Sequence, residues 1–366
     1  MSNPEPSTER LLETFLALLR VDSYFGDEDR VVAVLTELLE PAEVDFKRDA
    51  IGNLIGMWPG RESDAAPIML NAHMDTVQST AGLKLVVDEE GVGTDGSTIL
   101  GADNKSGVAA IVEAVLAVEG SGAAHGPVDL VFTIGEDVGH VGSKAFAPES
   151  IAATVGFVLD AGSPVGDVVT EAPGTRRLQA DFHGRAAHAG IEPEAGVSAI
   201  SIMSRAIANM PLGRIDAGTV ANIGTITGGQ ALNIVAPYAR LEAQARSLSE
   251  ERLDAQMAVM CAAMNEAAEH YAGSVDYAVE PFVRAYQLGD DDPALVRAEA
   301  AIRAAGLTPN RISTGGGSDA HEFNAKGMNT VCMGAGYRDA HAVTEFMPHD
   351  ELRRLTEVTI QLVLGA

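Results

Sequence analysis

The chain has 366 residues, of which 46% are hydrophobic, enough to form the cores of two domains. Acidic residues outnumber basic ones 52 to 25, and the formal net charge of -27 repels phosphate backbones, so we expect no nucleic-acid partner. Lysines are few, and no stretch approaches the length of a membrane span, so we expect no membrane partner. The first residues carry no basic leader, and Glu13 interrupts the first apolar run, which predicts a cytoplasmic protein.

The first part of the chain alternates between strand and helix patterns. Apolar segments typical of buried strands occur at residues 51–58, 67–73, 128–134 and 154–160, and apolar residues at helical spacing follow residue 108. This alternation predicts an α/β domain, in which a mainly parallel sheet carries helices on both faces. In such sheets, functional residues gather at the carboxyl ends of the strands.

The pattern changes at about residue 176. Strands are predicted at 177–183, 219–225, 233–246 and 275–286, and helices at 197–210 and from 250 to about 271. The order βαββαβ is that of a ferredoxin-like unit. Helix and strand patterns then return at 293–305, 329–334 and from 349. We therefore predict a catalytic domain made of residues 1–175 and 287–366, interrupted by an inserted domain at 176–286.

Polar side chains follow several of the predicted buried strands. His73 ends one strand, and Asp75 lies two residues further, where its carboxylate can reach the imidazole and fix its tautomer. Glu136 and Asp137 form an acidic pair in a glycine-flanked loop after the next strand, and Asp160 ends another. Each has an ordinary structural explanation when taken alone, as a turn or cap residue.

Two further residues complete this set. Asp103 lies just ahead of a helix that is predicted to begin at Ser106, where backbone N–H groups favour an anion. Alone it would be interpreted as a helix-capping residue. His341 follows the last predicted strand of the sheet. Two histidines and several carboxylates at the strand ends of one sheet match the ligands of paired zinc or related divalent ions.

The sequence resembles the co-catalytic zinc peptidases of the tripeptidase T, glutamate carboxypeptidase and aminoacylase group over nearly its whole length. The resemblance rests on His-Met-Asp-Thr at 73–76, Gly-Ala-Asp-Asn-Lys-Ser-Gly at 101–107, the acidic pair, Asp160 and His341, in that order. The glycine-rich loop at 315–320 and the segment at 183–190 are most similar to the tripeptidase T branch.

This resemblance implies a pair of divalent cations bridged by Asp103, with zinc expected and cobalt or manganese as alternatives. His73 and Asp160 would complete one site, and Asp137 and His341 the other. It also implies a cis peptide bond after Asp103. In one departure, Asp137 stands where the family usually has Glu, and its side chain is one methylene shorter. We therefore expect a weaker or shifted second site.

The catalytic roles follow from the same resemblance. Glu136 would be the general base, Asp75 would support His73, and His188, on the inserted domain, would stabilise the oxyanion. The sequence leaves open whether His188 acts within its own chain or across a homodimer formed through the inserted domain.

Four residues resemble substrate-binding positions of the family. Asn233 and Arg246 lie thirteen residues apart on one predicted strand, and Arg246 could grip a substrate carboxylate. Gly316 and Ser318 belong to a loop whose backbone N–H groups could approach the substrate. An exposed strand arginine and a flexible turn are the competing interpretations.

Taken together, the sequence predicts a di-zinc exopeptidase that hydrolyses short peptides with a metal-activated water, most similar to an aminotripeptidase. An N-acyl-amino-acid deacylase or a carboxypeptidase would share the same catalytic residues. A metal-poor homologue that binds peptides without cleaving them is a further alternative, and Asp137 is the feature that favours it.

Overall fold

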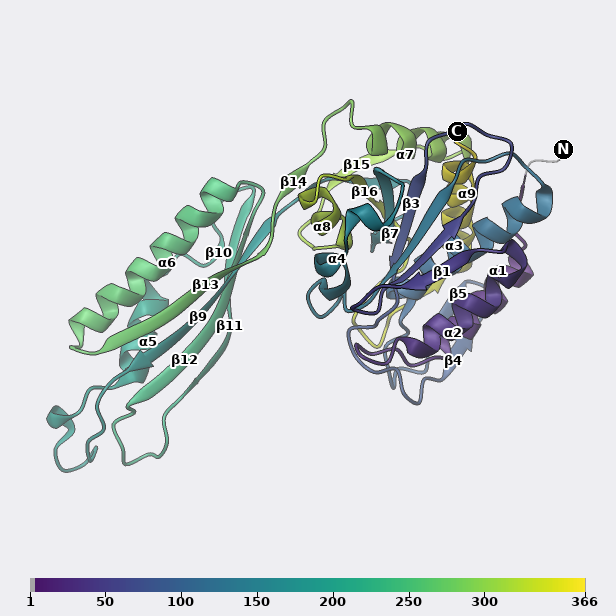
Figure 1. The fold of residues 1–366 in the computed structure, drawn as a ribbon. Coiled ribbons are helices and arrows are strands. Elements are labelled where there is room, and N and C mark those ends of the chain that lie inside the picture. Colours follow the sequence, from purple (N-terminus) through teal and green to yellow (C-terminus); the bar gives the residue numbers. More distant parts are fainter. Residues whose placement is uncertain (1–3, 366) are drawn as a thin grey trace. The chain divides into compact units, whose positions relative to one another are not determined.

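A computed structural model describes residues 4–365 of the chain (Figure 1). The chain divides into two compact units: unit 1 ends at Thr170 and resumes at Leu288, and unit 2 is Glu171–Gln287. The insertion was expected at 176–286. Its first boundary lies earlier, because the change of pattern at residue 176 falls inside strand β9 (Gly174–His183), which only Pro173 separates from β8 (Asp167–Ala172).

The main sheet has nine strands, and its centre is parallel. The central order is β6 (Val128–Thr133), β3 (Ile68–His73), β7 (Val155–Ala161) and β16 (Asn329–Gly334), each parallel to its neighbour. Antiparallel pairs flank this centre: β1 (Asp45–Arg48) and β2 (Leu54–Trp58) on one side, and β8 and β14 (Tyr286–Gln287) on the other, where β15 (Asn310–Ser313) also pairs with β8. The prediction of a mainly parallel sheet is confirmed for its centre.

Helices cover both faces of this sheet, as predicted (Figure 1). Strand β3 is buried throughout, and its alternate residues Ile68, Leu70 and Ala72 join the large core on one face. That core is completed by α1 (Thr8–Leu19), α2 (Asp29–Leu38), α3 (Ala102–Ser121), α7 (Pro293–Ala304) and α9 (His349–Leu364). The other face carries α4 (Val141–Ala145) and α8 (Asp319–Ala325), joined by an edge-on contact between Phe146 and Phe323. Within residues 4–365, no helix has both the length and the apolar character needed to cross a membrane.

A small second sheet lies in the same unit. It consists of β4 (Leu85–Val87), β5 (Gly91–Thr94) and β17 (Met347–Pro348), with β5 in the middle. At the end of β5, the Thr94 hydroxyl donates to the carbonyl of Val343 at 3.2 Å. Through these contacts the sheet holds residues 343–347 next to residues 92–94, which precede α3 in the chain.

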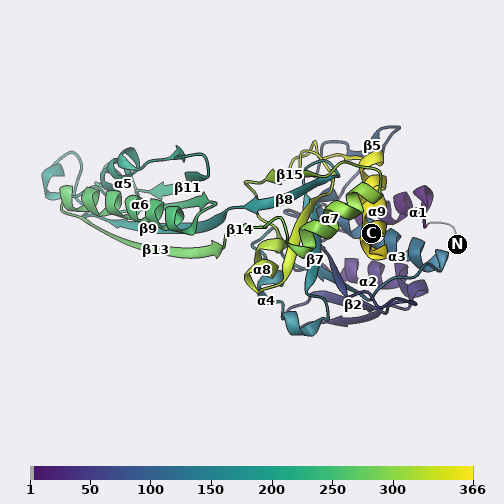
Figure 2. The same ribbon diagram turned by 90° about the horizontal axis from the view of Figure 1, so that it is seen from above.

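Unit 2 is a five-stranded antiparallel sheet with helices on one face (Figure 2). Its strand order is β10 (Gly213–Arg214), β11 (Thr219–Gly228), β12 (Tyr238–Ser247), β9 and β13 (Ser274–Val283). The helices α5 (Ala199–Asn209) and α6 (Glu250–His270) pack on the alternate apolar residues of the sheet, among them Leu178, Ala180 and Phe182. The Ser249 hydroxyl accepts the Arg252 N–H and caps α6, as its sequence indicates.

The predicted strand at 233–246 is shorter than expected. Strand β12 begins only at Tyr238, so the prediction that Asn233 lies on the same strand as Arg246 is wrong. The preceding residues pair elsewhere: Ala189 donates its N–H to the Asn233 carbonyl at 3.0 Å, and Pro237, which has no N–H, interrupts the ladder. As a result, Asn233 lies in a turn beside the loop that carries His188.

Candidate active site

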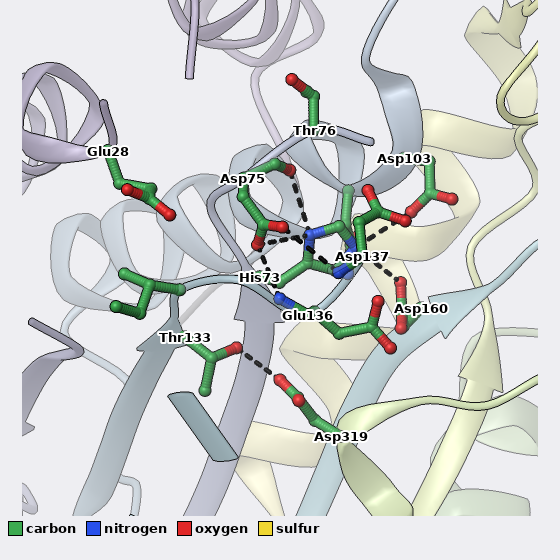
Figure 3. Close-up of polar contacts among 12 residues, drawn as sticks. Glu28, His73, Asp75, Thr76, Asp103, Thr133, Glu136, Asp137, Asp160 and Asp319 are labelled. Atoms are coloured by element: carbon green, nitrogen blue, oxygen red, sulfur yellow. Dashed lines mark hydrogen bonds and ion pairs between the residues drawn. The ribbon is translucent and has the colours of Figure 1, made fainter. Parts of the chain in front are cut away.

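The polar residues singled out in unit 1 meet at the carboxyl ends of its parallel strands (Figure 3). His73 is the last residue of β3, and Glu136 and Asp137 lie in the loop that follows β6, after Ile134 and Gly135. Asp160 lies at the end of β7, and the loop after β16 carries His341. Each parallel strand of the centre therefore delivers at least one polar side chain to the same edge of the sheet, as the sequence predicts.

Asp103 reaches this edge from the start of α3. The helix is assigned from Ala102, but Asp103 and Asn104 have non-helical backbone angles, and the regular helix follows them. The peptide bond between these two residues is cis, as the family resemblance implies. Gly101, with φ of +79°, provides the left-handed turn that brings the chain into this arrangement.

The two oxygens of Asp103 face two different histidines. Oδ1 lies 3.1 Å from Nε2 of His73, and Oδ2 lies 3.3 Å from Nε2 of His341. Asp160 Oδ1 lies 3.4 Å from the same nitrogen of His73, and Asp137 Oδ1 lies 3.0 Å from that of His341. The site therefore consists of two groups of donors, each centred on a histidine, that share one carboxylate.

The spacing of these donors fits divalent cations. Tetrahedral ligands at zinc bond lengths of about 2.0–2.1 Å are separated from one another by roughly 3.3 Å. The separations found here, 3.0–3.4 Å, are of that size. Asp137 Oδ2 is also buried without a hydrogen-bond partner among residues 4–365, which leaves it available as a ligand. Imidazole and carboxylate donors suit zinc, and carboxylates also suit manganese.

The charges of the site are strongly perturbed by their surroundings. Burial raises the pKa of Asp160 to about 7, and the nearby Asp103 carboxylate contributes to this rise. Burial likewise raises the pKa of Glu136 well above its usual range, with a further contribution from Asp160. Hydrogen bonds to Asp103 and Asp137 raise the pKa of His341 to about 10. The crowded acids therefore favour any added positive charge, whether it comes as protons or as cations.

Removing the metal with a chelator should give a protein that becomes less stable as the pH rises from about 5 to 8. The folded-state pKa of Asp160 is about 7, above its ordinary value of 3.8, so its deprotonation opposes folding across this interval. Neighbouring carboxylates outweigh burial and raise the pKa of His73 as well, so stability from its protonated form is lost as the pH rises through that raised value. Burial lowers the pKa of His125, so this one group contributes a stability that increases with pH, against the trend.

The melting temperature of the chelated protein, followed by circular dichroism between pH 5 and pH 8, measures this effect. Saturating zinc should flatten the profile, because the cations replace the protons on these ligands. A melting temperature of the chelated protein that rises across the same interval would contradict the assignment of these buried groups.

Asp75 supports the site from behind. Its Oδ1 lies 3.4 Å from Nδ1 of His73, so the carboxylate is in the expected place for orienting the imidazole. The same carboxylate accepts the backbone N–H of Glu136 at 3.0 Å and that of Asp137 at 3.2 Å. It therefore also fixes the turn that carries the acidic pair, a role that the sequence did not reveal.

A cavity of about 300 Å³ opens beside these residues. Its walls include Gly316, Ser318 and apolar side chains such as Ile312. The N–H of Gly316 donates to the Thr314 hydroxyl at 3.1 Å, and the N–H of Ser318 donates to His321 Nδ1 at 3.2 Å. The loop thus lines the cavity, and these two N–H groups have hydrogen-bond partners within the protein.

Other residues near the site were not assigned a role from the sequence. His140 has Nε2 at 3.3 Å from Oε1 of Glu136. The buried carboxylate of Asp319 accepts the hydroxyl of Thr133, and Tyr337 donates its hydroxyl to the Asp160 carbonyl at 2.6 Å. Their positions next to recognised motifs were the only signal, since none forms a pattern of its own.

Three predicted residues belong to unit 2. His188 accepts the N–H of Gly190 on its Nδ1 at 3.2 Å, and its backbone bridges to the turn that holds Asn233. Arg246 lies near the other end of β12, eight residues beyond Tyr238, a separation of about 27 Å along an extended strand. The structure therefore brings His188 and Asn233 together and keeps Arg246 apart from them.

Comparison with known proteins places the chain in a family. Residues 69–365 match the family described as Peptidase family M20/M25/M40. The chain belongs to this peptidase family. It is 38% identical to the YqjE protein of Bacillus subtilis, over 97% of this chain and 98% of that one. It is also 24% identical to Peptidase T of Vibrio parahaemolyticus, over 90% of each.

Solved structures of family members agree. Aminopeptidase PepT of Bacillus cereus has a TM-score of 0.91 at 36% identity, covering 98% of this chain and 99% of its own. A tripeptidase of Staphylococcus aureus has a TM-score of 0.94 at 34% identity, covering 98% of each. As a member of the M20 family, the chain is a metal-dependent peptide hydrolase of the tripeptidase T-like branch, and the predicted fold class and enzyme class are confirmed.

Proposed function

We propose that this M20 peptidase is a two-metal exopeptidase that removes the N-terminal residue from tripeptides. The observation that carries the proposal is the placement of Asp103 between His73 and His341, with the buried Glu136 on the neighbouring loop. The names of two similar solved proteins, an aminopeptidase PepT and a tripeptidase, support this substrate class.

In this proposal His73, Asp103 and Asp160 hold one cation, and Asp103, Asp137 and His341 hold the other. When bound, the cations polarise the scissile carbonyl and lower the pKa of a water molecule. Glu136 takes a proton from the attacking water and delivers it to the leaving amine. Its raised pKa suits both steps, because the carboxyl can hold the proton between them.

Zinc remains the proposed metal, with cobalt or manganese as alternatives. The short side chain of Asp137 does not keep it from the site, since its Oδ1 lies 3.0 Å from Nε2 of His341. This distance supports a second cation site and weighs against the metal-poor, non-catalytic alternative. Elemental analysis of the purified protein measures the metal content directly.

Unit 2 supports a role for a homodimer. A tripeptide spans only about 10 Å when extended. The distance of roughly 27 Å along β12 is therefore too long for one copy of unit 2 to place Arg246 and the His188–Asn233 pair on the same tripeptide. We propose that these two groups serve different metal centres of a homodimer, with His188 as the oxyanion donor. The cytoplasmic location, and the absence of nucleic-acid and membrane partners, stay predictions.

Products from a defined peptide panel test the proposed substrate class. Zinc-loaded protein is incubated with dipeptides, tripeptides and tetrapeptides of one composition, each with a free or an acetylated N-terminus, and products are identified by mass spectrometry. We expect loss of the N-terminal residue from free tripeptides and intact acetylated tripeptides.

The same panel separates the alternatives. Release of acetate would indicate a deacylase, and release of the C-terminal residue from blocked peptides would indicate a carboxypeptidase. Protein that binds two metal ions per chain but cleaves no member of the panel would contradict the tripeptidase proposal.

A further inference from the structure

The carboxylate of Glu345 is buried and accepts hydrogen bonds from three backbone N–H groups. The side chain is only 1% exposed. Its Oε2 accepts the N–H of Leu100 at 2.9 Å and of Gly101 at 2.7 Å, and its Oε1 accepts the N–H of Asp103 at 2.9 Å. One side chain near the end of the chain therefore binds three amides in the loop that carries the shared carboxylate.

These three amides form an anion-binding site at the start of α3. The first N–H groups of a helix have no partner within the helix, and the left-handed conformation of Gly101 turns successive amides toward a common point. The anion at that point is the chain's own carboxylate. The buried ammonium of Lys105, which donates to the Val21 carbonyl at 2.5 Å, provides positive charge on the same helix turn.

At its other end Glu345 belongs to the loop of His341. Arg338 and Phe346 close this loop with a pair of backbone hydrogen bonds of 2.9 and 3.1 Å. Within it, His341 has a left-handed φ of +67° and a side chain that is half exposed. Glu345, four residues further on, is the point where this loop is hydrogen-bonded to the start of α3.

We propose that Glu345 is a positioning residue of the metal centre, which fixes the His341 loop against the Asp103 loop. The proposal rests on the two-metal function proposed above. His73 and Asp160 are held by neighbouring strands of the sheet and do not need such a link. Asp103 and His341 lie on loops, so their separation depends on the contact that Glu345 makes. The second cation site, formed by Asp103 and His341 together with Asp137, is therefore the one that depends most on Glu345.

Glu345→Gln should weaken the second cation site. Glutamine keeps the shape of the side chain, but its NH₂ group has to face at least one of the three N–H donors, so a buried amide loses its partner. We expect the second zinc ion to bind about 10–100-fold more weakly, as is typical when a residue supporting a metal ligand is lost, and the first ion to lose less affinity, because only its shared ligand Asp103 lies next to the amides that Glu345 binds. Competition with a chromophoric zinc chelator measures both affinities without reference to activity.

Asp129→Asn is the matched control. The buried carboxylate of Asp129, at the opposite end of β6, accepts the N–H of Ala152 at 3.0 Å and of Ala153 at 2.8 Å. Both bonds go to Oδ2, so asparagine can keep them with its amide oxygen, and the replacement removes a buried negative charge away from the metal centre; zinc affinity should stay at the parent level. If both variants lose affinity to the same extent, the effect is one of general stability and the role of Glu345 is overturned.

Glu345→Asp separates position from charge. Aspartate retains the negative charge but is one methylene too short to reach all three amides, so it should also weaken the second site. It also replaces Glu345→Gln in the titration if that variant fails to fold by circular dichroism. Parent-like affinity in a folded Glu345 variant would overturn the proposal. A parent chain that binds fewer than two zinc ions would instead overturn the two-metal function itself.

Discussion

Glu136→Gln should abolish peptide hydrolysis while both metal ions remain bound. The substitution preserves the size of the side chain but removes the group that accepts the proton from water, so the turnover number should fall by roughly 10²–10⁴. The hydrogen bond from the Glu136 backbone N–H to Asp75 does not involve the substituted side chain, so the turn should keep its shape. Steady-state kinetics on a free tripeptide, combined with elemental analysis of the same sample, measures both parts of the prediction.

Glu322→Gln is the matched control for this substitution. The imidazole of His140 lies between the two carboxylates: its Nε2 faces Glu136, and its Nδ1 lies 3.9 Å from Oε1 of Glu322. We expect the turnover number of Glu322→Gln to be within a few-fold of the parent. The metal content of Glu136→Gln is also decisive, because Glu136 lies within coordination reach of His73 and Asp160. Loss of an ion would make Glu136 a ligand, and parent-like turnover would show that another group is the base.

The fold was predictable where a segment's own residues determine its environment. The central strands are mostly apolar because both faces are covered, and their bounds differ from the predicted ones by at most one residue. The flanking strands β1, β8 and β15 could not be recognised in the same way. Strands β1 and β15 have only four residues each, all three strands are partly exposed, and β8 pairs with β16, which is distant in sequence.

The same distinction applies to the site. His73, Asp137 and Asp160 are marked by their position directly after apolar strands, and the structure brings them together. Glu345 has no such local signal, because its partners are three backbone amides between Leu100 and Asp103, which are distant from it in the sequence. The partners of two N–H groups in the glycine loop, the Thr314 hydroxyl and His321 Nδ1, likewise cannot be inferred from the glycines, and a role of this loop in substrate binding stays a prediction.

Two impaired variants should restore activity to each other, assayed at tripeptide concentrations below the parent KM, if the homodimer proposal is correct. His188→Ala should lower turnover by about 10²–10³-fold, the usual effect of removing an oxyanion donor. Arg246→Ala should mainly raise the KM for tripeptides, because the bidentate grip on a carboxylate is lost. In a mixed dimer one centre has both residues and the other has neither. Random subunit exchange places the two variants together in about half of the dimers, so roughly a quarter of the parent activity should return.

Recovery depends only on the two groups serving different centres, so it tests the geometry of unit 2 without assuming which centre each group serves. The chain with both substitutions, mixed with either single variant, should recover nothing, since no dimer then contains a complete centre. Arg240→Ala, on the same strand and paired with Asp181 at 3.6 Å, should keep parent activity by itself. Differently tagged chains show whether mixed dimers form. If they form but stay inactive, His188, Asn233 and Arg246 do not all act on the same substrate molecule. In that case either Arg246 or the His188–Asn233 pair has no part in substrate binding, because the strand between them is too long for one tripeptide.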